Sequence, residues 1–331
     1  MRDVITDVAG IKVGHASNFE GYTGCTVVLC EEGAIGGIDI RGSAPGTRQV
    51  DSLFPLHLVS KVHAVLLTGG SSFGLDAAGG VARYLEERGK GFDVSVTHVP
   101  IVPTAVIFDL LFGDHATRPN ADMGYEACMA ASSHEVPEGS VGVGTGATIG
   151  KLYELSRASK GGVGTASITG PGGLIVGALV VVNALGDVID SETGALMAGL
   201  RESETSVRLV STADLLCQGA EKIHLGHAPV GNTTLGVVAT NALLTREEAI
   251  KMAQMANNGL ARTISPISTS FDGDVVFSLS LGQVQVAADV NNAGMLAERA
   301  VIRAVRRAIV KAEGFGLLPA HKDLHPDTVS I

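Results

Sequence analysis

The sequence has no tryptophan, and aromatic residues make up only 4% of its 331 residues although 45% are hydrophobic. The core must therefore be built from valine, isoleucine, leucine and alanine, which favours an α/β architecture of sheets covered by helices. Glycine is abundant, with 43 copies, and predicts many turns and close approaches of the backbone. Length alone leaves one domain or two open.

Positive charge is scarce and scattered. The 24 lysines and arginines stand against 34 acidic residues, giving a net charge of −10, and the densest basic group is Arg306-Arg307 with Arg303 and Lys311 nearby. An acidic protein repels phosphate backbones, so we expect no nucleic-acid partner.

Cysteine and long apolar runs are also limited. The most apolar run, residues 174–185, is too short to cross a bilayer, and residues 1–7 lack the apolar segment of a signal peptide. His224 and His227 lack a third convincing ligand, so we expect no metal site. We expect a cytoplasmic protein without a membrane partner, whose scattered cysteines are buried free thiols: Cys25, Cys30, Cys128 and Cys217.

Short apolar runs alternate with glycine turns over most of the chain. Thr245 and Glu248 form a capping box that marks the start of a helix. Residues 190–229 are polar and variable, which predicts a solvent-facing linker with little sheet. The expected strands are 11–15, 24–30, 34–40, 61–68, 174–183 and 275–281, and the expected helices are 75–88, 245–262 and 291–313.

Residues 70–74 match the G-x-S-x-G pattern of a serine nucleophile, with Ser72 at its centre and a strand before and a helix after it. A hydrolase of that kind also needs an acidic residue and a histidine after further parallel strand–helix units, and that pattern is not evident here. We therefore favour a glycine turn with serine at a helix N-cap.

Two glycine-rich turns lie at residues 141–151 and 159–165, and the first does not fit a phosphate-binding loop, because Leu152 stands where serine or threonine is required. The first turn is interpreted as an active-site loop that offers backbone N–H groups and Lys151. Lys160 in the second turn is a rival for the same role. Asn183, at the end of an apolar strand, either caps a turn or donates to a substrate or oxyanion.

Residues 230–241 place a polar pair, Asn232-Thr233, ahead of a valine-rich run. Thr233 is therefore expected at the first position of a buried strand. It is either a structural residue or a nucleophile that attacks the carbonyl of Asn232 and breaks the chain. Asp272 and Asp274 flank a glycine at another strand entrance, where they form a turn or hold the amine of a nucleophile.

These blocks, taken in order, resemble the DmpA-like peptidases of family S58. That family includes L-aminopeptidase/D-Ala esterase-amidases, β-peptidyl aminopeptidases and nylon-oligomer hydrolases. The resemblance spans essentially the whole chain and is carried by residues 7–15, 23–27, 67–78, 160–165, 232–241 and 271–274.

The resemblance implies an αββα layered sandwich, similar to N-terminal-nucleophile hydrolases but with different connectivity. It implies a single domain, residues 1–331, that cuts itself between Asn232 and Thr233 into fragments 1–232 and 233–331. It also implies a homo-oligomer, a tetramer of cleaved heterodimers, and no cofactor.

Site residues also follow from the resemblance. Thr233 matches the nucleophile, Asn183 the active-site asparagine, and Asp272 and Asp274 the acidic pair of the nylon-oligomer branch. Lys151 aligns with the active-site lysine, with Lys160 as the alternative. The tyrosine of the aminopeptidase branch has no clear match, because Tyr153 is slightly displaced.

The chemistry is self-consistent, because cleavage before Thr233 creates an α-amine with a reference pKa of roughly 7.7–8.0 that can serve as a general base. The sequence predicts an autoprocessing amidohydrolase or aminopeptidase acting on peptides or amino-acid oligomers. The alternatives are an autoprocessing acyltransferase, a serine hydrolase that uses Ser72, and a binding protein on the same scaffold.

Overall fold

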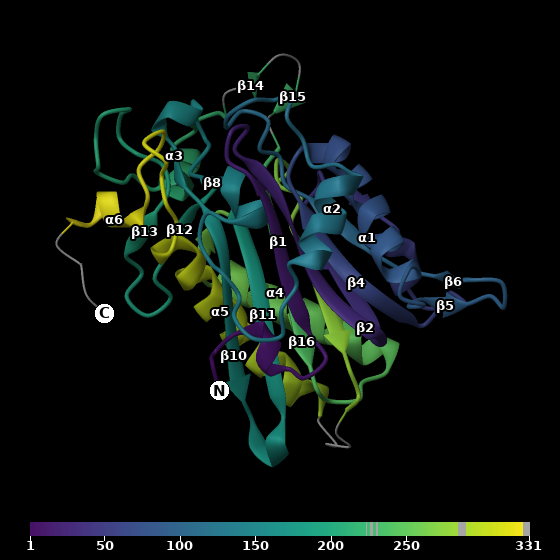
Figure 1. Cartoon of the computed structure of the whole chain (residues 1–331). Helices are drawn as coiled ribbons and strands as arrows, with labels where there is room; N and C mark the ends of the chain where they lie inside the picture. Colours follow the sequence, from purple (N-terminus) through teal and green to yellow (C-terminus); the bar gives the residue numbers. More distant parts are fainter. Residues whose placement is uncertain (223, 226–227, 230, 284–288, 327–331) are drawn as a thin grey trace.

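The computed structural model describes residues 1–222, 224–225, 228–229, 231–283 and 289–326. Within these residues the main sheet has nine strands, in the order β10-β11-β16-β18-β2-β4-β7-β3 with β1 beside β2 (Figure 1). The strands are β1 Lys12–Asn18, β2 Thr23–Ile40, β3 Thr47–Arg48, β4 Lys61–Thr68, β7 Thr104–Val106, β10 Gly162–Thr169, β11 Ile175–Asn183, β16 Thr233–Thr240 and β18 Val275–Ser280.

Strand β2 joins the two halves of this sheet. The sequence predicted separate strands at 24–30 and 34–40, and this was wrong, because the chain continues as one strand through a register shift between Leu29 and Ala34. The hydrophilic residues between the two apolar runs form a bulge within the strand and not a turn. The first half of β2 pairs with β1 and β4, and its second half pairs with β18.

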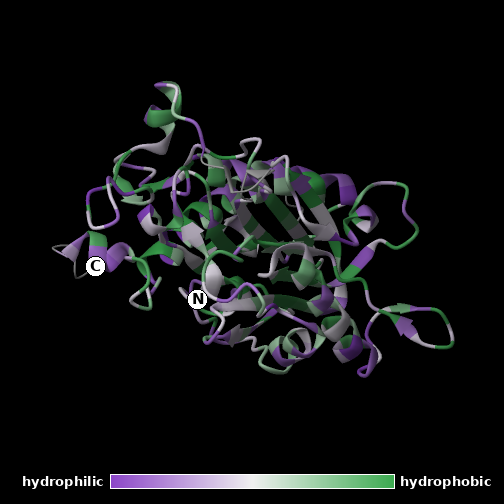
Figure 2. Cartoon of the chain, turned by 90° about the horizontal axis from the view of Figure 1, so that it is seen from above, coloured by the Kyte–Doolittle hydropathy of each residue, from purple (hydrophilic) through white to green (hydrophobic). Residues whose placement is uncertain are grey.

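The two halves of the sheet face each other across the central core. Leu179 of β11 and Leu67 of β4 belong to the same buried cluster, although their strands are not neighbours in the sheet. Val180, on the opposite face of β11, belongs to the cluster under two helices, α4 (Arg246–Ala261) and α5 (Val290–Val310). Strand side chains alternate between faces, so each half is covered on both sides. Figure 2 shows hydrophobic residues concentrated between the layers.

Helices α1 (Ala77–Glu86) and α2 (Ala121–Met129) cover the other outer face, over β1, β2 and β4. The expected αββα layering is therefore confirmed. The capping box at the start of α4 is also confirmed, since the Thr245 side chain accepts from the backbone N–H of Glu248 and the Glu248 carboxylate accepts from that of Thr245.

Much of the described part of residues 190–229 faces solvent and forms little sheet, as its polarity predicted, but a buried carboxylate fixes it to the fold. Asp187, buried in β12, accepts hydrogen bonds from the backbone N–H of Leu200 (2.8 Å) and from the backbone N–H (2.6 Å) and hydroxyl (2.8 Å) of Thr212. One carboxylate thus anchors the segment at two points. The four cysteines are free, but Cys217 is exposed, so the prediction of burial holds only for the other three.

The remaining elements are short. The other described strands and α-helices are β5 Phe92–Asp93, β6 His98–Val99, β8 Thr148–Ile149, β9 Ser159–Lys160, β12 Asp187–Ile189, β13 Leu196–Ala198, β14 His224–Leu225, β15 Ala228–Pro229, β17 Ile264–Ser265, α3 Thr212–Cys217 and α6 His321–Leu324. His227 lies outside the described residues. Among the described helices, none is long and apolar enough to span a bilayer.

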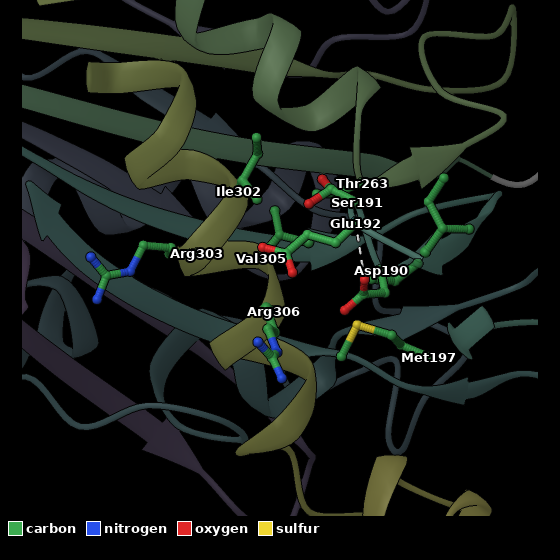
Figure 3. Close-up of a pocket in the computed structure, with 11 residues that line it drawn as sticks. Asp190, Ser191, Glu192, Met197, Thr263, Ile302, Arg303, Val305 and Arg306 are labelled. Atoms are coloured by element: carbon green, nitrogen blue, oxygen red, sulfur yellow. Dashed lines mark hydrogen bonds between the residues drawn. The ribbon is translucent and has the colours of Figure 1, made fainter. Parts of the chain in front are cut away.

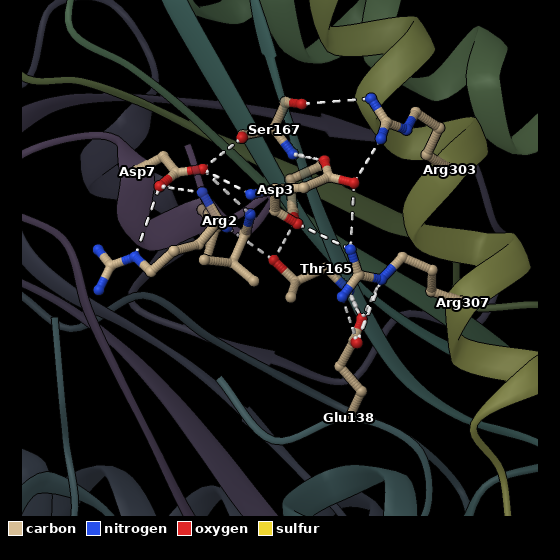
Figure 4. Close-up of polar contacts among 11 residues, drawn as sticks. Arg2, Asp3, Asp7, Glu138, Thr165, Ser167, Arg303 and Arg307 are labelled. Carbon is tan, nitrogen blue, oxygen red and sulfur yellow. Dashed lines mark hydrogen bonds and ion pairs between the residues drawn. The ribbon is translucent and has the colours of Figure 1, made fainter. Parts of the chain in front are cut away.

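The start of the chain is hydrogen-bonded to the C-terminal half of helix α5 (Figure 4). The carboxylate of Asp3 accepts from the guanidinium groups of Arg303 and Arg307, and Glu138 accepts from Arg307 at 2.5 to 3.1 Å. Asp7 accepts from the hydroxyl of Ser167 on β10 at 2.7 Å. These contacts join the first residues of the chain to β10 and to α5, which are far from them in the sequence.

Asp187→Asn is expected to change how stability depends on pH. Burial raises the pKa of the Asp187 carboxyl from 3.8 to about 6. A raised folded-state pKa means that this group stabilises the fold fully below its unfolded pKa and loses that contribution as pH rises through about 6. Relative to the variant, the wild-type free energy of unfolding should fall by about 2–3 kcal/mol between pH ~4 and ~6. Urea unfolding at several pH values measures this, and parallel pH curves for the two proteins would contradict it.

Candidate active site

The sheet topology brings the predicted site residues to one edge. Strand β11 runs antiparallel to β16 and β18 runs parallel to it, so the end of β11 and the starts of β16 and β18 lie together. Asn183, the last residue of β11, is directly opposite Thr233, the first residue of β16. Asn232 forms a bridge with Asp272, just before β18.

The carbonyl oxygen of Asn232 receives two donors. The hydroxyl of Thr233 donates to it at 2.6 Å, and the backbone N–H of Gly273 donates to it at 2.7 Å. Asn232 is fully buried and Thr233 is 4% exposed. The peptide bond between Asn232 and Thr233 therefore has the Thr233 hydroxyl beside its carbonyl group. The carbonyl oxygen also accepts from a fixed backbone N–H.

The two carboxylates hold the backbone around this bond. Asp274 accepts from the backbone N–H of Thr234 at 2.6 Å and of Ser268 at 2.9 Å. Asp272 accepts from the backbone N–H and hydroxyl of Thr269 at 2.9 and 2.6 Å. Burial and the neighbouring Asp272 raise the pKa of the Asp274 carboxyl. A carboxyl of this kind can hold or release a proton near neutral pH.

Lys151 lies within this constellation, and Lys160 has a different environment. The Lys151 ammonium donates to the side-chain oxygen of Asn183 at 2.8 Å and to its backbone oxygen at 3.0 Å. The three donors of Lys160 all bind backbone carbonyls, those of Gly144, Ala147 and Gly161. Burial lowers the pKa of Lys151 well below its usual value, which favours a neutral amine able to accept a proton.

The amide of Asn183 is fixed on both sides. Its oxygen accepts from Lys151 and from the backbone N–H of Thr148 at 3.0 Å, and its nitrogen donates to the carbonyl of Phe108 at 3.2 Å. The side chain thus joins the glycine-rich loop to β11 and Phe108, rather than capping the turn that follows. This geometry supports a role in the site.

Several residues at the site carried no local sequence signal. Asp109, next to Phe108, is buried and accepts from the hydroxyl of Thr23 and the N–H of Gly70. Its charge acts on both Lys151 and Lys160. Lys222 is buried and donates to the backbone carbonyl of Lys151 at 3.0 Å. Each stands alone in the sequence, and only folding places it here.

Two other sequence candidates are not joined to this cluster by any of the described side-chain hydrogen bonds. Ser72 follows β4 as the elbow pattern requires, but its side chain is exposed, and the described hydrogen bonds give it no histidine partner. Tyr153 packs its ring under the guanidinium of Arg157 at 4.5 Å.

Two adjoining hollows lie elsewhere, between α5 and the β12–β13 hairpin. The larger has a volume of about 540 Å³ and includes Arg306 and His321 in its lining. Figure 3 shows the smaller, about 80 Å³, with Arg306 of α5 on one side and Asp190 and Met197 on the other. None of the predicted site residues lines either hollow.

Two solved structures share this fold. The L-aminopeptidase D-Ala-esterase/amidase of Ochrobactrum anthropi, described as a new variant among the Ntn hydrolase fold, has a TM-score of 0.72 over 98% of this chain and 93% of its own, at 19% identity. A β-aminopeptidase of Burkholderia sp. has a TM-score of 0.68 over 100% and 95%, at 21% identity. The fold is that variant of the N-terminal-nucleophile hydrolases.

The chain belongs to peptidase family S58, whose profile matches residues 3–317. An uncharacterized aminopeptidase of Mycobacterium leprae is 42% identical over 97% of this chain and 94% of its own. A 6-aminohexanoate-oligomer endohydrolase of Kocuria sp. is 31% identical over 85% and 75%. The protein is a hydrolase that acts on amide bonds.

Proposed function

We propose that the chain cuts itself between Asn232 and Thr233, and that the freed Thr233 is the nucleophile of an amidohydrolase for peptides or amino-acid oligomers. The observation that carries the proposal is the pair of donors on the Asn232 carbonyl oxygen, Thr233 at 2.6 Å and Gly273 at 2.7 Å. A fixed donor at this distance matches the geometry that stabilises an oxyanion.

The cut proceeds by an acyl shift followed by hydrolysis. A base takes the proton of the Thr233 hydroxyl, and the oxygen adds to the Asn232 carbonyl carbon while the Gly273 N–H stabilises the developing oxyanion. The intermediate collapses with transfer of a proton to the Thr233 nitrogen, the C–N bond breaks, and an ester remains. The Thr233 nitrogen is then a free α-amine, and water hydrolyses the ester, releasing the carboxyl of residue 232 and restoring the Thr233 hydroxyl.

The same threonine then serves in turnover. Its α-amine, with a reference pKa of roughly 7.7–8.0, accepts the hydroxyl proton as the oxygen attacks the substrate carbonyl. The protonated amine returns the proton to the leaving amine, and water hydrolyses the acyl-enzyme. Asp272 and Asp274 orient the segment that carries the amine, and Asn183 with backbone N–H groups of the glycine-rich loop stabilises charge on the substrate oxygen.

The proposed substrates are short peptides or amino-acid oligomers with a free amine near the scissile bond. The buried acidic pair Asp272 and Asp274 favours a cationic group, and relatives are named as an uncharacterized aminopeptidase and as a 6-aminohexanoate-oligomer endohydrolase. The chemistry uses no cofactor. We also propose a cytoplasmic homo-oligomer of cleaved units, in keeping with the free cysteines.

Intact-mass measurement of the purified protein tests the proposal. Two polypeptides are expected, ending at residue 232 and beginning at residue 233, and the shorter one should be acylated at its N-terminal threonine by a slowly hydrolysed ester substrate. A single uncut chain with amidase activity would reject the proposal. Fragments produced by cleavage at any other bond would reject it as well.

Gly273→Ala is expected to slow the cut by at least about tenfold. A methyl group at residue 273 would lie 2.6 Å from the Ala44 carbonyl oxygen and 3.0 Å from the Thr233 hydroxyl, so the N–H donor must move. Gly231→Ala is the matched control on the other side of the bond, because its nearest contact is an ordinary 3.4 Å to Phe108. Time courses of fragment formation compare the two, and equal rates would contradict the donor role of Gly273.

A further inference from the structure

Lys222 is a buried lysine beside the site, ten residues before the proposed cut. Its side-chain nitrogen donates to the backbone carbonyl of Lys151 at 3.0 Å and lies 5.7 Å from the ring centroid of Phe271, next to Asp272. It therefore contacts the segment that carries the active-site lysine and the segment that carries the acidic pair.

An ammonium in this position is costly to bury. It has three donors, and the hydrogen bonds among the described residues use one of them, on a neutral carbonyl. Burial lowers the pKa of Lys222 to about 8, and the attraction of Asp272 opposes that shift. Apolar packing would be satisfied by a side chain without charge, so the charge of this lysine is the feature that calls for a role.

Self-cleavage makes a demand that turnover does not. In the uncut chain the nitrogen of Thr233 is an amide, which has no basic lone pair, so another group must take the hydroxyl proton. The Lys151 amine, held by Asn183 directly opposite Thr233, is the basic nitrogen that the geometry offers. After the cut, the α-amine of Thr233 replaces it.

Building on the proposed function, we propose that Lys222 is a positioning residue for self-cleavage. Its ammonium fixes the Lys151 segment against the Phe271–Asp272 segment, at the spacing in which the Lys151 amine serves the cut. Lys222 touches neither Thr233 nor Asn232 in any described contact, and acts through Lys151.

The charges around Lys151 support this assignment. After burial, the charge of Lys222 has the largest effect on the pKa of Lys151 and lowers it; Lys160 also lowers it. Asp272 and Asp109 raise it. Removing the charge of Lys222 therefore raises the pKa of Lys151 and leaves less neutral amine at pH ~7.

The test follows the cut in freshly synthesised chain from about pH 6 to about pH 10. Lys222→Met has a similar length and no charge. It should shift the rising limb of the pH–rate profile to higher pH by about one unit, so that the cut is about tenfold slower at pH ~7. Lys222→Arg keeps the charge and should restore the rate to within about threefold of wild type. Thermal melting of each variant reports its folding.

The mature enzyme supplies the internal control. Once Lys222→Met has been cut to completion at high pH, the pH profile of its kcat/KM should match wild type, because the α-amine is then the base. The role of Lys222 is overturned if Lys222→Met cuts with the wild-type pH profile. It is also overturned if Lys222→Arg shows the same shift of that profile as Lys222→Met. If Lys222→Met fails to fold, Lys222→Gln decides by the same criteria. Absence of cutting in wild type overturns the proposed function instead, so the two failures are distinct.

Discussion

Thr233→Ala should remain one uncut polypeptide and should not hydrolyse amides. The substitution removes the hydroxyl that lies 2.6 Å from the Asn232 carbonyl oxygen, so no group is left to start the acyl shift or to form an acyl-enzyme. Loss of the nucleophile in a well-studied serine protease lowers kcat by about 10⁶-fold, and a comparable loss is expected here. Intact mass and a peptide-hydrolysis assay measure the two effects.

The fold should survive this change. The Asn232 carbonyl keeps the hydrogen bond from Gly273, and the strand pairing of Thr233 with Asn183 uses backbone atoms. Thr233→Ser is the matched control, because it retains the hydroxyl and should still cut, with less restriction of its rotamers. Formation of the 1–232 and 233–331 fragments by the alanine variant would refute the mechanism.

Substitution of the two candidate lysines should give opposite results. Lys151→Met is expected to slow the cut by about 10²- to 10⁴-fold, the usual contribution of a general base, with a small change in melting temperature. Lys160→Met should instead destabilise the fold by about 1–3 kcal/mol, because the buried carbonyl of Gly161 loses the lysine donor. The carbonyls of Gly144 and Ala147 also lose the lysine, but they keep backbone donors, the N–H groups of Ala147 and Gly161.

Chemical unfolding and cutting rates of the two variants separate these effects. Folded Lys160→Met should cut at nearly the wild-type rate, because its amine is fully occupied by carbonyls. The assignment of Lys151 fails if its variant cuts normally while the Lys160 variant, although folded, does not.

The fold was predictable where a segment carried one dominant pattern. The apolar run at 174–183 and the capping box at Thr245 specify a strand and a helix by local chemistry, and both are observed. Strand β2 was misread because its hydrophilic middle looks like a turn, whereas a bulge keeps it paired. The attachment of the polar segment after residue 190 was not predictable, because its anchor, Asp187, is a single carboxylate outside the segment.

The candidate site was predictable only to the extent that its parts lie in recognisable motifs. Thr233 and the acidic pair stand at strand entrances, so their position could be read from the sequence. The choice between Lys151 and Lys160 could not be made, because both follow glycine turns and only the register of the folded loops separates their contacts. Lys222 is placed by long-range packing, which leaves no periodic or motif signal.

Strand β16 lies between β11 and β18, and β18 lies between β16 and β2. A break before Thr233 would assign β16, β18, α4 and α5 to one piece and every other strand of the main sheet to the second. Neither piece could leave without tearing hydrogen-bonded ladders on both sides, so the halves would be interlocked rather than merely docked. Such a molecule should elute as one species under native conditions and separate only on denaturation. Halves synthesised apart would have to thread together while folding, which makes the uncut chain the natural route to assembly.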